Sequence, residues 1–257
     1  MFDLVTIGHT ARDEFEGDPE WRIGGTATYA AAAAACLGDR VALLTRIGPT
    51  ERDRLAARCR ELGIELHALE SEVTTTFAFR YIDGRRRLRL KARAKAIGAD
   101  AIPDALRDTR AVVLASIAHE IEPSVFDVYG SVPRVLAAQG YLRSWDADGT
   151  VRRRDWDEAR EVLRRVTVTV VSDEDIEVGE PIYECPDCGS VTIRGKWSIE
   201  GARTLTAAAR MLRDYAHELE HMRASGLELA SPVEADYGIV RPGGASSDDL
   251  DDRDDLA

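Results

Sequence analysis

The stretch GGTATYAAAAAACLGDRVALLTRIG, residues 24–48, decides the fold class. Its Ala-rich part, Thr26–Leu37, predicts a closely packed helix that ends at Gly38. The apolar run Arg40–Gly48 follows at once and predicts a buried strand. A helix that leads directly into a buried strand is typical of a parallel sheet with helices on its faces.

The same alternation continues on both sides of this stretch. Before it, Phe2–Gly8 (FDLVTIG) is a short apolar run that predicts a first buried strand. After it, Glu51–Leu62 has a helical pattern, and Gly63–Leu69 (GIELHAL) predicts a third strand. The order β-α-β-α-β therefore predicts an α/β fold.

Further strands follow along the chain. Thr74–Tyr81 and Arg85–Ala92, joined by Asp83 and Gly84, predict a β-hairpin. Later elements are predicted as three buried strands, one helix and one more short strand, in the order Ala111–Ile117, Val132–Gln139, Asp155–Leu163 (helix), Arg165–Ser172 and Val191–Trp197.

Composition predicts a globular protein and limits its partners. Of 257 residues, 44% are hydrophobic and 31% charged, and the four cysteines make no disulfide framework. No apolar run reaches the ~18 residues of a membrane helix, and no basic leader precedes the first strand. We therefore expect a cytoplasmic protein that is neither secreted nor embedded in a membrane.

The charge of the chain is strongly acidic and its cations are almost all arginine. The net charge is −12, and only three lysines (Lys91, Lys95 and Lys196) stand among 34 cationic residues. This balance suits a halophilic host or a GC-rich genome, and it argues against binding to nucleic acid or anionic lipid. Six aspartates in residues 248–257 predict a disordered acidic tail.

Five short motifs occur in a telling order. They are GHTARD (8–13), at the end of the first strand, GGTATYA (24–30), TTTF (74–77), QGYLR (139–143) and SDED (172–175). In this order they resemble the PfkB/ribokinase family of carbohydrate kinases, and most of all its inositol-kinase-like branch. The resemblance covers about residues 2–176. It implies a ribokinase-like three-layer αβα sandwich with a β-hairpin, here incomplete.

The resemblance also implies a pocket for a small sugar or cyclitol. Its residues would be Asp13, Gly24, Gly25, Thr26 and Tyr29. The chemistry fits, because a carboxylate accepts hydrogen bonds from two vicinal hydroxyls, and glycines let the backbone approach a ligand closely. The helix N-terminus after Gly25 offers free N–H groups. Thr26 and Tyr29 replace residues that are common in ribokinases, so we expect a substrate other than ribose.

The catalytic part of the family pattern is incomplete. Ser172 and Asp175 match the element that helps to hold Mg²⁺ and the phosphates of ATP. The late Gly-Ala-Gly-Asp motif, which carries the general base and the anion hole, is absent from residues 176–257. Because phosphoryl transfer depends on positioning and charge stabilisation, its loss predicts weak or no turnover. We therefore assign no catalytic residue.

The C-terminal third predicts a different kind of module. Cys185 and Cys188 form a CPxCG zinc-knuckle turn, and His217 and His221 lie four residues apart on one face of a predicted helix. Four such ligands would complete a structural Zn²⁺ site. Zinc shared between two chains and a knuckle without metal remain alternatives.

The helix predicted over residues 202–223 has an apolar seam with heptad spacing. The seam would either pack on the sheet or pair two chains in a homodimer. If the helix covers the sheet, removal of the chain after Ile176 should make the protein insoluble. We accordingly divide the chain into a kinase-like part (1–176), a knuckle-and-helix part (177–241) and the acidic tail (242–257).

Three functions follow from these observations. The first is an impaired ATP-dependent carbohydrate kinase, and the second is a non-catalytic polyol-binding or zinc-dependent interaction module. The third is a truncated, fused kinase without function.

Overall fold

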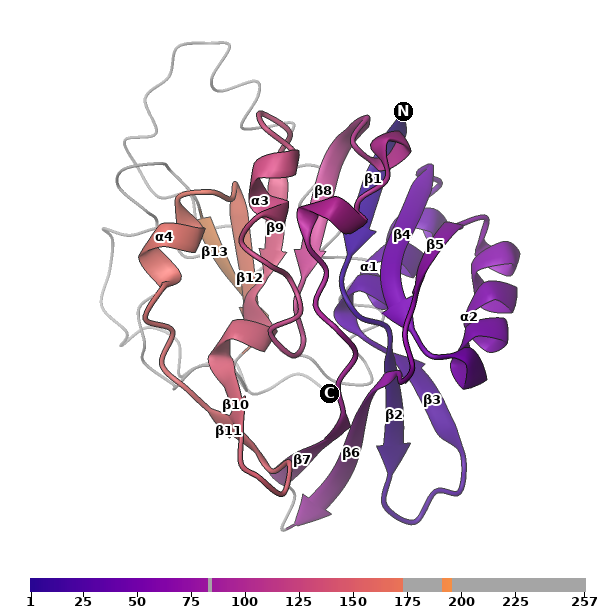
Figure 1. Cartoon of the computed structure of the whole chain (residues 1–257), viewed down its shortest axis with the longest axis vertical. Helices are drawn as coiled ribbons and strands as arrows, with labels where there is room; N and C mark the ends of the chain where they lie inside the picture. Colours follow the sequence, from indigo (N-terminus) through magenta and orange to yellow (C-terminus); the bar gives the residue numbers. More distant parts are fainter. Residues whose placement is uncertain (83–84, 173–190, 196–257) are drawn as a thin grey trace, which may run out of the picture.

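A computed structural model of the chain describes residues 1–82, 85–172 and 191–195 (Figure 1). Its centre is a seven-stranded parallel sheet of order β13-β12-β9-β8-β1-β4-β5. The strands are β1 (Phe2–Ile7), β4 (Val41–Ile47), β5 (Glu65–Glu70), β8 (Thr109–Ala115), β9 (Arg134–Ala137), β12 (Val168–Ser172) and β13 (Val191–Gly195).

Helices cover both faces of this sheet, so the fold has three layers (Figure 1). Along β4, Leu43 joins the apolar cluster under α1 (Thr26–Cys36) and α2 (Pro49–Leu62), whereas Leu44 joins the cluster under α3 (Val125–Val128) and α4 (Ala159–Leu163). Strand residues alternate between faces, and both faces of a parallel sheet are buried. The predicted three-layer α/β fold is confirmed.

A second sheet of order β3-β2-β6-β7 stands beyond the C-terminal ends of the parallel strands. It consists of β2 (Ala11–Phe15), β3 (Trp21–Gly24), β6 (Thr75–Ile82) and β7 (Arg85–Ala92). β6 and β7 form the predicted antiparallel hairpin, in which Ile82 pairs with Arg85. The pair β10 (Arg143–Trp145) and β11 (Val151–Arg153) adjoins β7, where the amide of Leu90 donates to the carbonyl of Gly149.

Several elements differ from the sequence predictions. Asp13 does not end the first strand, because β1 stops at Ile7 and Asp13 lies within the separate strand β2. β2, β3, β10 and β11 are short and polar, so apolar periodicity does not detect them. The helix predicted over residues 155–163 is confined to Ala159–Leu163. The predicted strand at 191–197 is present as β13, the edge neighbour of β12.

The remaining C-terminal predictions lie outside the described residues. These are the knuckle, the helix at 202–223 and the acidic tail. Among the described helices, none combines the length and apolarity that crossing a bilayer requires.

Candidate functional site

The candidate site lies where the two sheets meet. The chain passes from β1 to β2 through Gly8, His9 and Thr10, and it returns from β3 into α1 through Gly24 and Gly25. The parallel strands present their C-terminal ends at this edge, where ligands bind in open α/β sheets. The site is therefore built by two segments, residues 8–13 and 24–29, and by the loops that follow β8 and β9.

The glycine pair is required by close contacts within the protein itself. A Cβ at Gly24 would lie 1.9 Å from Oδ2 of Asp13, and a Cβ at Gly25 would lie 2.4 Å from the carbonyl oxygen of His9. Gly25 also has φ +97°, a conformation that side chains other than glycine rarely adopt. The missing side chains therefore let β3 and the start of α1 pass directly over Asp13 and His9.

Asp13 is the unusual ionisable group of the site. Burial raises the pKa of its carboxyl to about 7, and the charges of Arg143 and Arg86 oppose that shift. Within the described residues, no donor is hydrogen-bonded to this carboxylate. Because an ionised carboxylate only accepts hydrogen bonds, Asp13 offers two acceptor oxygens in a poorly solvated place.

Arg143 is placed beside Asp13 by β10. Its side chain is buried, and the guanidinium lies 5.9 Å from the ring centroid of Phe77. Phe77 in β6 is directly opposite Asp13 in β2, so the two side chains share one face of the second sheet. The QGYLR motif (139–143), which ends at Arg143, therefore reaches the same site as Asp13.

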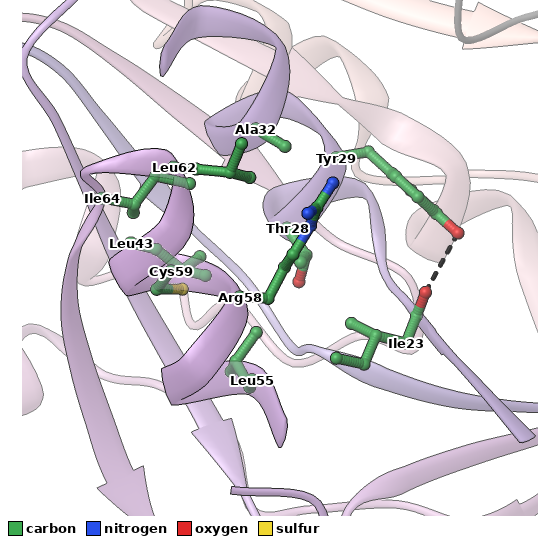
Figure 2. A pocket seen from close by; sticks show the side chains of 10 residues that line it. All are labelled: Ile23, Thr28, Tyr29, Ala32, Leu43, Leu55, Arg58, Cys59, Leu62 and Ile64. Carbon is green, nitrogen blue, oxygen red and sulfur yellow. Dashed lines mark hydrogen bonds between the residues drawn. The ribbon is translucent and has the colours of Figure 1, made fainter. Parts of the chain in front are cut away.

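Tyr29 and Thr26 occupy the first turns of α1. The hydroxyl of Tyr29 donates to the carbonyl of Ile23 at 3.1 Å, and burial together with the charge of Asp13 raises its pKa. Tyr29 also borders an apolar cavity of about 170 Å³ between α1 and α2 (Figure 2). Thr26 is the first residue of α1, whose N-terminus no side chain caps. The N–H groups of this turn are the donors nearest in sequence to the glycine pair.

A buried polar network centred on Glu120 was not predicted from the sequence. Glu120 is fully buried and accepts hydrogen bonds from the amides of His9, Ile117 and Ala118 and from the hydroxyl of Ser116. Every one of these donors belongs to the segments that follow β1 and β8. A signal was present in the sequence, since the polar residues Ser116, His119 and Glu120 come directly after a buried strand.

His9 is part of the same network and is neutral. Its Nε2 lies 2.9 Å from the carbonyl of Lys95, and its Nδ1 lies 2.7 Å from the hydroxyl of Thr75. A carbonyl can only accept, so Nε2 carries the proton and Nδ1 accepts from Thr75. Burial lowers the pKa of this imidazole despite the nearby charge of Glu120. His9 therefore holds β1, β6 and the chain after β7 together without adding charge.

The remaining predicted site residues are not placed by the structure. Ser172 is the last residue of β12, at the same C-terminal edge of the sheet, but its side chain is outside the description. Asp175, Cys185, Cys188, His217 and His221 lie outside the described residues. Within the described part, no three His, Cys, Asp or Glu side chains are grouped so that they could hold a metal ion.

No protein-family model and no curated protein sequence matches the chain. Solved structures do match in fold. A pyrophosphate-dependent kinase of the ribokinase family, solved as a sulfate complex, superposes with a TM-score of 0.60 at 21% identity over 67% of this chain. A structure of a pyrophosphate-dependent kinase of that family with a pyrophosphate analogue and myo-inositol gives 0.59 at 21% identity, again over 67% of this chain.

A fructokinase from Halothermothrix orenii is more distant, with a TM-score of 0.52 at 15% identity over 67% of this chain and 69% of its own length. The chain spans 62% of the length of each of the two pyrophosphate-dependent kinase structures. These similarities show that the described part has the ribokinase fold.

Proposed function

We propose that the chain is a kinase-related protein of the ribokinase type that binds a sugar or cyclitol at the junction of its two sheets. The observation that carries this proposal is the carboxylate of Asp13, which is desolvated, lies against Gly24 and has no hydrogen-bond donor among the described residues. The printed descriptions of the similar structures, which name myo-inositol in one case and fructokinase in another, support it.

The chemistry of binding follows from the residues at this edge. The ionised carboxylate of Asp13 accepts hydrogen bonds from two hydroxyl groups of the ligand. Such charge-assisted hydrogen bonds are stronger than neutral ones. The first turn of α1, at Gly25 and Thr26, offers N–H groups to a further oxygen of the ligand. The hydroxyl of Tyr29 already donates its hydrogen bond to the carbonyl of Ile23. Tyr29 would therefore line the rim of the polyol site rather than donate to the ligand.

Phosphoryl transfer to the bound polyol would be a second step after binding. It would form a bond between a substrate oxygen and the terminal phosphorus of ATP, break the bond to ADP and give the hydroxyl proton to a base. By resemblance, Ser172 and Asp175 would help to hold Mg²⁺ and phosphate, but the Gly-Ala-Gly-Asp motif that supplies the base is absent. We therefore expect weak or no transfer. The two structures of a pyrophosphate-dependent kinase make pyrophosphate a second phosphoryl donor to test.

A polyol-binding module without catalysis is the second candidate function. The same carboxylate supports it, and the missing base favours it. The C-terminal segment would then contribute a Zn²⁺ site of Cys185, Cys188, His217 and His221 or pair two chains through residues 202–223. Metal content of the purified chain, with and without Cys185→Ser, tests the zinc proposal independently of any ligand.

The deciding experiment measures polyol binding by calorimetry, together with release of ADP or phosphate from Mg·ATP or Mg·pyrophosphate, in dilute buffer and in molar KCl. We expect one polyol of an inositol, glucose, fructose and ribose panel to bind. Asp13→Asn should weaken it about 10- to 100-fold, as loss of a charged hydrogen-bond partner does. Asp104→Asn, an exposed control carboxylate, should change nothing.

Equal affinity in Asp13→Asn and the parent would refute the site. Turnover that survives in the full chain would refute the expected loss of catalysis and restore the kinase. Binding without turnover would support the polyol-binding module. A folded chain that binds no polyol would leave the zinc-dependent interaction module and the truncated kinase without function, which the metal content separates.

A further inference from the structure

His119 has a strained backbone at the edge of the candidate site. With φ +55°, it is the only residue other than glycine with positive φ among the described residues. This left-handed conformation is unfavourable for a residue with a Cβ. Strain of this kind persists only where the surroundings enforce it, and it is concentrated at functional sites.

The surroundings of His119 do enforce it. Arg93 donates from Nε to the carbonyl of Ala118 at 2.6 Å and from Nη2 to the carbonyl of His119 at 2.7 Å. On the ring, Nε2 donates to the backbone carbonyl of Arg143, which leaves Nδ1 as the second polar atom of the imidazole. The backbone is thus fixed by Arg93, the residue that follows β7, and the imidazole by Arg143 in β10.

The imidazole is one part of an aromatic pair. The ring of Trp145 meets it edge to face, with centroids 5.5 Å apart and planes at 83°. Trp145 remains 37% exposed, which is unusual for a large indole that is packed on one side. The guanidinium of Arg93 lies over the indole, 5.9 Å from its centroid, and the exposed remainder of the ring is a stacking surface beside the imidazole of His119.

Strand register places this pair on the face of the sheet that carries Asp13. Trp145 in β10 is opposite Val151 in β11, and Val151 packs against the cluster of Phe77 and Leu90. Directly opposite residues of an antiparallel pair share a face. Arg143, two residues before Trp145, is on the same face, and its guanidinium reaches the ring of Phe77, the residue opposite Asp13.

We propose that His119 and Trp145 are specificity-determining residues that select ring-shaped over open-chain polyols at this site. A ring polyol has an apolar C–H face, which stacks on the indole, while its hydroxyls point outward to the Asp13 carboxylate and to Nδ1 of His119. An open-chain polyol has no rigid C–H face, and it loses more conformational freedom on binding. This inference rests on the proposed polyol site.

The test compares six-carbon ring polyols with open-chain ones by calorimetry on the full chain. Myo-inositol is compared with mannitol, which has the same number of hydroxyls, and glucose is compared with its reduced open-chain form, glucitol. The parent should prefer at least one ring over its open-chain counterpart by tenfold or more. Trp145→Leu should abolish that preference with little change for the open-chain ligand, and Trp145→Phe should keep it. His119→Asn, which tolerates the left-handed backbone, should weaken ring binding alone.

Trp21→Leu is the matched control. Trp21 is opposite Glu14, on the other face of β2 and β3, where Arg12 and Arg54 lie over its ring. It should leave the ring preference intact. Polyol binding that requires Asp13 but has no ring preference, or keeps it in Trp145→Leu, would overturn this inference alone. If the folded parent bound none of the four ligands, the proposed polyol site would fall and the inference with it.

Discussion

The residue with the largest consequences in the candidate site is Asp13. Its carboxyl has a pKa of about 7 because burial disfavours the charged form more than Arg143 and Arg86 favour it. A polyol whose hydroxyls donate hydrogen bonds to Asp13 would stabilise the ionised carboxylate. Binding of the polyol and ionisation of Asp13 are therefore linked. Affinity should therefore rise as pH increases through neutrality.

The same pKa predicts how stability depends on pH. The folded carboxyl holds its proton more tightly than the unfolded one, whose pKa is 3.8. The carboxyl of Asp13 therefore makes a favourable contribution to the free energy of unfolding below about pH 4. This contribution is lost as pH rises through about 7. Asp13→Asn should thus be more stable than the parent at pH 8 by about 1–2 kcal/mol, a value reduced for partial solvation, and the gain should vanish near pH 4.

Urea unfolding of both proteins across this pH range measures the difference. A constant difference between pH 4 and pH 8 would contradict the raised pKa.

At the scale of elements, Glu120 joins the end of β8 to the end of β1. Its two oxygens accept hydrogen bonds from three backbone amides and one hydroxyl, and its side chain is fully buried. The amide of His9, just after β1, donates to Glu120 across 111 positions of sequence. The carboxylate therefore fixes the geometry of the loop that carries His119.

Glu120→Gln should reduce the free energy of unfolding by about 2–4 kcal/mol, because the amide of glutamine would face buried N–H donors that need acceptors. Chemical denaturation measures the loss. Glu122→Gln, an exposed position in the same segment, is the control and should be nearly neutral. Equal losses in the free energy of unfolding at both positions would show that the hydrogen bonds of Glu120 do not stabilise the junction of β1 and β8.

At the scale of the whole molecule, β13 and β5 are the outermost strands of the parallel sheet within the described residues. β13 pairs in parallel with all five residues of β12. A strand without its neighbour exposes unpaired N–H and C=O groups and promotes aggregation. The C-terminal third of the chain therefore contributes to the sheet through β13.

A chain cut after Ile176 should accordingly aggregate, because it lacks β13. Its solubility can be compared by sedimentation with that of the full chain and of a chain cut after Gly195. Solubility of the longer fragment would assign the protection to β13, and aggregation of both would assign it to residues 196–257, as the predicted covering helix requires. If the fragment that ends at Ile176 stayed as soluble as the full chain, the edge argument would be wrong.

Local patterns in the sequence were sufficient for the α/β fold. The Ala-rich run of α1, the apolar runs of β1 and β4 and the Asp-Gly turn between β6 and β7 each have a periodicity or turn chemistry that depends on neighbouring residues alone. The glycine pair at 24 and 25 was also visible, although its closest contacts proved to be Asp13 and His9.

Only the tertiary structure decided how the site is arranged. Asp13 proved to lie within a strand of the second sheet with Arg143 beside it, Glu120 proved to bind the amide of His9, and His119 proved to have a strained conformation. Arg143, Glu120 and His119 are more than 100 positions from Asp13 in the sequence, and Arg143 is 130 positions away. Strand register and burial set these relations, and neither is encoded in the local alternation of polar and apolar residues.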